Sequence, residues 1–150
     1  KYGDRTDLAA SAGRWMAHAG ADILTAETVL VPVPAHWRRL LSRRYNPAVE
    51  LTKEIGRIAG CTTVLGALRR HRATPTQKGR DRSARFENLA NAISPHPKDG
   101  DALGGGRVCV VDDTMASGAT LSAACDAVWS AGAGDVTVLV LAKSIRSSYL

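Results

Sequence analysis

The stretch that decides the fold is Val108-Cys109-Val110-Val111-Asp112-Asp113-Thr114-Met115-Ala116-Ser117-Gly118-Ala119-Thr120. Its four leading apolar residues predict a buried parallel strand, and two aspartates come where that strand should end. A loop of small residues follows, and then an amphipathic helix with apolar side chains at Leu121, Ala124, Cys125, Val128 and Trp129. Because ligands of open α/β sheets bind beyond the carboxyl ends of the strands, the stretch predicts a ligand site at the acidic pair.

The loop over residues 116–120 has the composition of a phosphate site. Small residues let a phosphate approach closely, backbone N–H groups at a helix N-terminus donate to it, and the Ser117 and Thr120 hydroxyls add donors. Asp112 and Asp113 would repel a phosphate unless they served another part of the ligand, and ribose hydroxyls or hydrated Mg²⁺ suit them. We therefore expect an anion at this loop, in a ribose 5-phosphate site. The alternative is a strand end whose aspartate only caps the next helix.

A second strand end carries an anion-binding pattern. Residues 28–33 are β-branched and apolar, and Pro34, Ala35 and His36 follow them, with Arg39 just beyond. A rigid proline turn followed by arginines can clamp a multiply charged anion, although a structural turn with surface arginines explains the pattern equally well. Two such strand ends in one chain support each other more than either does alone.

The rest of the chain alternates between helical and strand patterns. We expect a helix capped by Asp7 and ended by Gly20, and another capped by Asn46 and ended by Gly60. The first helix should bury Leu8, Ala12, Trp15, Met16 and Ala19. Further expectations are a strand over 61–68, a polar loop over 69–83, a helix over about 84–93 and a strand over 136–142. This alternation predicts an α/β fold, a doubly wound, mostly parallel sheet with helices on both faces.

Composition agrees with one globular domain over residues 1–150. Hydrophobic residues make up 45% of the chain, and a formal net charge of +6 favours anionic partners, either phosphorylated small molecules or nucleic acid. The three cysteines form no disulfide or metal-binding pattern, which predicts a cytoplasmic protein. No apolar run has the length of a membrane span, and the N-terminus has no signal-peptide pattern.

Taken together, these segments resemble the type I phosphoribosyltransferases and, over essentially the whole chain, the ComF family (competence protein F or amidophosphoribosyltransferase-like proteins). The motifs that carry the resemblance are Lys1-Tyr2-Gly3, the VPVP-x-His turn, Arg43-x-Tyr45-Asn46, Arg72-x-Thr74-x-x-Gln77 and the DD…SGAT stretch. Arg44 and Pro47 depart from it, since the family usually has Gly and Gln there. Family members often carry an N-terminal four-cysteine zinc module, which this chain lacks, so we expect no zinc.

The resemblance implies a role for each segment. Asp112 and Asp113 would hold the ribose hydroxyls of phosphoribosyl pyrophosphate. The 5′-phosphate loop would comprise Thr114, Met115, Ala116, Ser117, Gly118, Ala119 and Thr120, and the pyrophosphate loop Val33, Pro34, Ala35, His36 and Arg39. Arg72, Thr74 and Gln77 lie in segment 69–85, which holds seven Lys or Arg residues and one acid. This segment could be a flexible lid over the ligand, a solvated loop or a nucleic-acid contact.

The function implied is a phosphoribosyltransferase that binds phosphoribosyl pyrophosphate and Mg²⁺, transfers the 5-phosphoribosyl group and releases pyrophosphate. Mg²⁺ would bind only with the ligand, and the residues identify neither an acceptor nor a catalytic base. The alternative is a non-catalytic protein that binds ribose phosphates or assists DNA uptake, with DNA or competence proteins as partners. A kinase that makes phosphoribosyl pyrophosphate is disfavoured, because those enzymes duplicate this domain.

Overall fold

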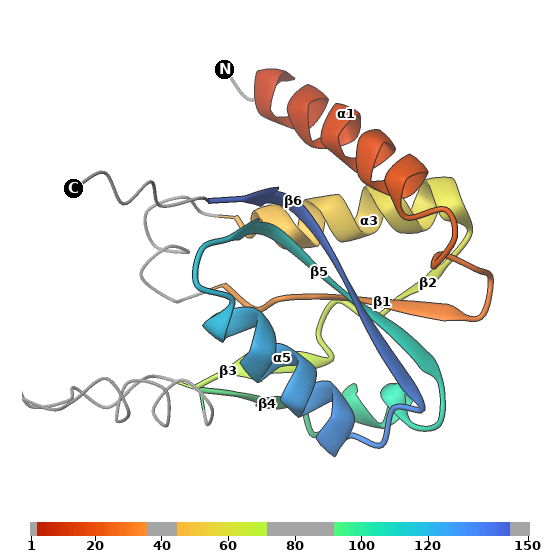
Figure 1. Ribbon diagram of the computed structural model, residues 1–150, viewed down its shortest axis with the longest axis vertical. Helices are drawn as coiled ribbons and strands as arrows, with labels where there is room; N and C mark the ends of the chain where they lie inside the picture. The colour runs from red at the N-terminus through yellow and green to blue at the C-terminus, as the bar shows by residue number, and fades with distance from the viewer. Residues whose placement is uncertain (1–2, 36–44, 72–91, 145–150) are drawn as a thin grey trace, which may run out of the picture.

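A parallel sheet of four strands forms the centre of the molecule. The computed structural model describes residues 3–35, 45–71 and 92–144, with side chains from Leu8 onward. The strands are β1 (Thr28–Pro32), β2 (Thr62–Thr63), β5 (Arg107–Met115) and β6 (Asp135–Lys143), in the order β2-β1-β5-β6 (Figure 1). The central pair is the apolar β1 and β5, as expected for strands that are covered on both faces.

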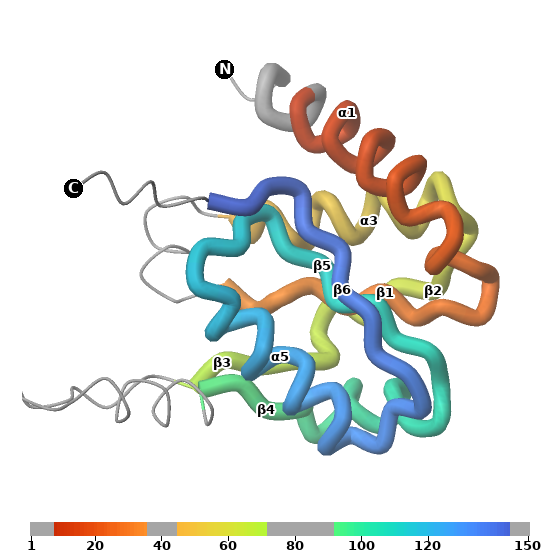
Figure 2. The backbone as a smooth tube through the Cα atoms, viewed as in Figure 1, coloured from red at the N-terminus to blue at the C-terminus, as the bar shows by residue number. Residues whose placement is uncertain are grey.

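Helices cover both faces of this sheet. Helices α1 (Gly3–Ala19) and α3 (Pro47–Ala59) lie side by side on one face, and α5 (Ala119–Ser130) lies on the other (Figures 1 and 2). An antiparallel hairpin of β3 (Leu68–Arg70) and β4 (Ile93–Pro95) packs against α5, and a short 3₁₀ helix, η1 (Gly100–Leu103), precedes β5. The predicted doubly wound, mostly parallel α/β sheet is confirmed.

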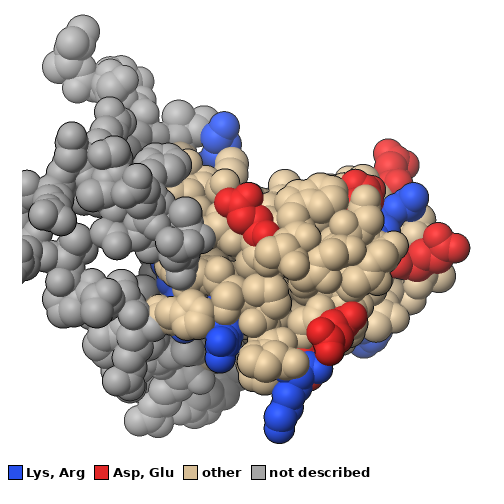
Figure 3. All heavy atoms as spheres, turned by 90° about the horizontal axis from the view of Figure 1, so that it is seen from below, with Lys and Arg blue, Asp and Glu red and all other residues tan. Residues whose placement is uncertain are grey.

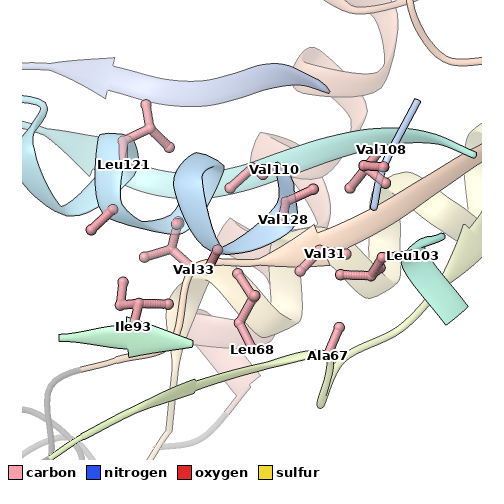
Figure 4. Close-up of a cluster of buried hydrophobic side chains, with 14 residues drawn as sticks. Val31, Val33, Ala67, Leu68, Ile93, Leu103, Val108, Val110, Leu121 and Val128 are labelled. Carbon is pink, nitrogen blue, oxygen red and sulfur yellow. The ribbon is translucent and has the colours of Figure 1, made fainter. Parts of the chain in front are cut away.

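Two apolar cores follow from the alternation of side chains along β5. Val108 and Val110 belong to the cluster beneath α5 and the hairpin, whereas Cys109 and Val111 belong to the cluster beneath α1 and α3. All four side chains are fully buried. Figure 4 shows the first cluster, in which side chains of β1, β5, α5, β3 and β4 meet. A strand buried on both faces must be apolar at every position, which is why this one was readable in the sequence.

The chain diverges between β1 and β5. From β1 it continues through α3 to β2 on one side, and from β5 it continues through α5 to β6 on the other. The two strands pair directly, from Thr28 opposite Arg107 to Pro32 opposite Val111. Their carboxyl ends therefore adjoin at the topological switch point, where doubly wound sheets bind their ligands.

The first helix differs from its prediction. It begins at Gly3, so Asp7 lies inside it, and both Leu8 and Trp15 are 69% exposed. Ala12 and Met16 are buried as predicted, together with Gly13 and Ala17, whereas Ala19 is exposed. A Cβ at Gly13 would lie only 2.8 Å from the Glu54 Cβ of α3, so small residues set this close helix contact.

The region after α3 also departs from the prediction. The expected strand over 61–68 divides into the short β2 and a turn, and Leu68 begins β3, whose partner is β4. Ile93 starts β4 and does not end a helix, and the rest of the expected helix lies outside the described residues. The predicted final strand is confirmed as β6. Of the helices described, none has the length and apolar character to span a bilayer.

Candidate functional site

A cleft of about 300 Å³ lies where β1 and β5 end. Its lining comprises Val33, Pro34, Ala35, Tyr45, Asn46, Pro47, Arg70, Asp112, Asp113, Thr114, Met115, Ala116, Ser117, Gly118, Thr120 and Leu121. The cleft thus brings together the two strand-end segments that the sequence singled out separately. Of the predicted site residues, Ala119 is buried and does not line it, and His36, Arg39, Arg72, Thr74 and Gln77 lie outside the described residues.

The two aspartates sit within β5, just before its end. The strand continues past them as far as Met115, because Thr114 and Met115 still pair with Ala142 and Lys143 of β6. Both carboxyl groups are half-buried, and the Asp113 backbone N–H donates to Asp112 Oδ1 at 2.8 Å. That bond helps to fix the orientation of the Asp112 carboxylate within the cleft.

The connection from β5 to α5 is shorter than the predicted phosphate loop. Thr114 and Met115 belong to the strand and α5 begins at Ala119, so the loop itself is 116–118. Gly118 is the N-cap residue with φ 76° and ψ −8°, the left-handed conformation that suits glycine, and no side chain caps the helix. At the start of the helix, the Ala119 backbone N–H donates to Ser117 Oγ over a long distance of 3.5 Å. The interpretation of Asp113 as a helix cap is therefore wrong.

On the β1 side, a single asparagine holds the turn after the strand. The Val33 N–H donates to Val111 O at 2.9 Å, which extends the contact of the two strands by one residue. Asn46 Nδ2 then donates to Val33 O at 3.0 Å, while Asn46 Oδ1 accepts from the Ala48 N–H at 3.1 Å. The predicted cap of α3 is confirmed, and the same side chain anchors residues 33–35 at the edge of the cleft.

Several lining residues had no assigned place in a site. The sequence indicates a helix start and family positions at Asn46 and Pro47 and a basic segment at Arg70, but it assigns none of them a role in the site. Tyr45 belonged to a family motif without a role. No local signal marks Arg70 as a site residue, because its strand β3 pairs with β4, which is distant in sequence.

The polar groups of the cleft fit a metal that arrives with its ligand. Within the described residues, no three His, Cys, Asp or Glu side chains are grouped so that they could hold a metal ion. Asp112 and Asp113 supply carboxylate oxygens, the ligands that Mg²⁺ prefers, and Mg²⁺ usually completes its shell with water and substrate phosphates. The carboxylates of Asp112 and Asp113 are thus chemically suited to hold Mg²⁺.

None of the three cysteines lines this cleft. Cys61, Cys109 and Cys125 carry free thiols, and burial raises the pKa of the Cys109 thiol to about 11. Burial also raises the pKa values of Cys61 and Cys125. All three thiols are therefore protonated at neutral pH and act as packing groups, not as nucleophiles.

One curated relative matches the sequence, and no protein-family model does. Competence protein F of Haemophilus influenzae is 29% identical over 115 residues, which cover 77% of this chain and 50% of that protein. The chain thus spans about half the length of the curated relative.

Solved structures resemble the fold over nearly the whole chain. Glutamine phosphoribosylpyrophosphate amidotransferase from B. subtilis has a TM-score of 0.60 at 19% identity, covering 91% of this chain and 26% of that one. The structure of the allosteric regulatory enzyme of purine biosynthesis gives 0.58 at 18% identity, covering 89% and 26%. The protein TT1426 from Thermus thermophilus has a TM-score of 0.54 at 18% identity, and the match covers 95% of this chain and 85% of that one.

The chain therefore has a phosphoribosyltransferase-like fold, with a cleft at the switch point of its sheet. The match to competence protein F supports the resemblance to the ComF family that the sequence motifs indicated.

Proposed function

We propose that the cleft binds phosphoribosyl pyrophosphate and that the protein transfers the 5-phosphoribosyl group with release of pyrophosphate. One observation carries the proposal. A half-buried acid pair, a glycine-containing loop at a helix start and a proline turn meet in a single cleft at the switch point of the sheet. A ribose with an anionic group at each end needs all three kinds of surface.

Each segment has a separate task in this proposal. Asp112 and Asp113 accept hydrogen bonds from the ribose 2′- and 3′-hydroxyls. The first backbone N–H groups of α5 have no acceptor within the helix, so they donate to the 5′-phosphate at loop 116–118. Residues 33–35 border the pyrophosphate. This arrangement fixes C1 of the ribose for attack and places the leaving pyrophosphate beside residues 33–35.

Mg²⁺ is part of the proposal as a companion of the ligand. Asp112 and Asp113 are the carboxylates that would hold it together with oxygens of the pyrophosphate and ribose. When bound, Mg²⁺ supplies positive charge that offsets the negative charge developing on the departing pyrophosphate.

The double variant Asp112→Asn, Asp113→Asn tests the proposal, because it keeps side-chain size and removes two negative charges. Each lost charge-assisted hydrogen bond is worth about 1.5–3 kcal/mol, so we expect the affinity for phosphoribosyl pyrophosphate with Mg²⁺ to fall about tenfold or more. Calorimetric titration measures this fall. Thermal unfolding should change little, because neither carboxyl group caps a helix.

A matched control replaces acids away from the cleft. Asp101→Asn with Asp135→Asn removes the same charge from exposed positions, and it should leave the affinity unchanged. Equal affinity of the wild type and the cleft variant would overturn the ribose role of the pair.

A second candidate function is supported by the similarity to competence protein F: a non-catalytic accessory protein in DNA uptake. Figure 3 shows one face of the molecule, on which Lys, Arg, Asp and Glu residues that are described all occur. Tight, steeply salt-dependent DNA binding without measurable binding of phosphoribosyl pyrophosphate would favour this candidate and overturn the enzyme.

A further inference from the structure

We propose that Arg70 is a phosphate-binding residue that the β3–β4 hairpin contributes to the cleft. This inference rests on the proposed function and assigns Arg70 to the 5′-phosphate of the ligand. The 5′-phosphate subsite is then built from two separate parts of the fold, and it selects a phosphate monoester of ribose. The strand–loop–helix segment at 112–120 contributes one part, and β3 contributes the other.

Alternation along β3 sends neighbouring arginines to opposite sides. Leu68 is buried in the cluster beneath α5, and Arg70, two residues on, is half-buried and lines the cleft. Arg69 between them is exposed, and its Nε donates to Ser94 Oγ of β4 at 3.2 Å. The strand therefore presents one guanidinium to the cleft and the other to the outer side of the hairpin.

The packing of the hairpin brings Arg70 to the α5 side of the cleft. Arg70 pairs with Ile93 of β4, and Ile93 shares a buried cluster with Leu121 in the first turn of α5 (Figure 4). Leu121 and Thr120 line the cleft as well. Both strands of the hairpin contact α5, so Arg70 lies beside α5, next to the loop proposed for the 5′-phosphate, although Val33 of the proposed pyrophosphate segment belongs to the same buried cluster.

The acidic charge of the cleft favours a role for the Arg70 guanidinium in binding an anion. Among the lining residues that are described, Asp112 and Asp113 are the acids and Arg70 is the one Lys or Arg. A dianionic phosphate that enters beside two carboxylates gains from a nearby cation, and a guanidinium offers paired donors that match two phosphate oxygens. A sugar without the phosphate gains no binding energy from these donors. Arg70 therefore contributes selectivity for the phosphorylated ligand.

The test compares Arg70→Gln with the matched control Arg69→Gln. Calorimetry measures three probes, each with Mg²⁺: phosphoribosyl pyrophosphate, ribose 5-phosphate and inorganic pyrophosphate. Arg70→Gln should weaken the first two by the same factor, about tenfold to a hundredfold, and leave pyrophosphate binding within about twofold. Arg69→Gln should leave all three unchanged, and Arg70→Lys, which keeps the charge but not the fork, should lie between the wild type and Arg70→Gln. Equal thermal unfolding of the Gln variants excludes a folding effect.

The outcomes separate this inference from the proposed function. If the wild type binds phosphoribosyl pyrophosphate and Arg70→Gln matches it, the inference is overturned while the function stands. Selective loss of pyrophosphate binding in Arg70→Gln also overturns it, because Arg70 would then serve the other end of the ligand. If the wild type binds ribose 5-phosphate in an Arg70-dependent way but never phosphoribosyl pyrophosphate, the inference stands and the proposed function fails. A wild type that binds none of the probes overturns both.

Discussion

Gly118 is the residue at which the candidate site depends most on backbone conformation. Its φ of 76° is left-handed, and the loop can turn into α5 there without a side chain in the way. Gly60 at the end of α3 has nearly the same conformation, with φ 70°, but lies away from the cleft. The two glycines therefore form a matched pair, in which one affects the site and the other only the fold.

Gly118→Ala and Gly60→Ala should each lower the free energy of unfolding by about 1–2 kcal/mol, the cost of a left-handed L-residue. Neither added Cβ clashes, since Met115 Sδ lies 3.7 Å from the position at Gly118 and nothing lies within 4 Å at Gly60. Only Gly118→Ala should weaken binding of phosphoribosyl pyrophosphate, because it alone shifts the amides at loop 116–118. Urea unfolding and calorimetry measure the two effects, and unchanged affinity in Gly118→Ala would contradict the assignment of the phosphate loop.

Between elements, Asn46 links the start of α3 to the end of β1. Its Oδ1 caps the helix and its Nδ2 holds Val33 O, so one side chain stabilises α3 and places residues 33–35. Two substitutions separate these tasks. Asn46→Asp keeps the cap but loses the donor, whereas Asn46→Ala loses both.

Asn46→Ala should lower the free energy of unfolding by about 1–2 kcal/mol, the value of a helix cap, and Asn46→Asp should lower it less. Both variants should weaken binding of inorganic pyrophosphate, since both release the Val33 carbonyl. Denaturant unfolding and pyrophosphate titration give the comparison. Wild-type affinity in Asn46→Asp would mean that the amide donor does not position this turn for binding.

The elements that the sequence predicted well are those whose signals are local. β5 is apolar on both faces, and Asn46 and Gly60 bound α3 through their own side chain or backbone conformation. β3 was missed because its partner β4 is distant in sequence, so no local pattern marks the hairpin. The buried face of α1 was misjudged because Gly13 and small neighbours, not Trp15, pack on α3.

The candidate site follows the same division. Asp112, Asp113 and loop 116–118 come from one continuous motif, and residues 33–35 from a second, so both were visible in the sequence. Tyr45 and Arg70 reach the cleft only through tertiary packing, which a linear pattern does not record. The remaining candidates stay predictions because they lie outside the described residues: His36 and Arg39 of the pyrophosphate loop, and Arg72, Thr74 and Gln77 of the expected lid.

At the scale of the whole molecule, the sheet separates two apolar cores, and the central strand β5 carries the Cys109 thiol in one of them. Cys109 is fully buried in the cluster beneath α1 and α3, which also contains Cys61. The folded state therefore keeps that thiol protonated at pH values where an unfolded chain releases the proton. Because the pKa of this thiol differs between the folded and unfolded states, the stability of the fold depends on pH in the alkaline range.

We expect the free energy of unfolding to fall as the pH rises from about 9 towards 11. Burial raises the pKa of Cys109 from 9.0 to about 11, so below pH 9 its contribution is fully present, and above it the unfolded thiol ionises first. With these pKa values, the free energy of unfolding lost at pH 10 is about 1.4 kcal/mol.

Urea unfolding at pH 7.5 and pH 10 measures this loss in the wild type and in Cys109→Ala, where the other titrating groups are the same. Cys109→Ala should be less stable at pH 7.5 because it leaves a small cavity, yet it should lose less stability on going to pH 10. Parallel pH profiles of the two proteins would show that the thiol titrates alike in the folded and unfolded chains, which would contradict its burial in the sheet.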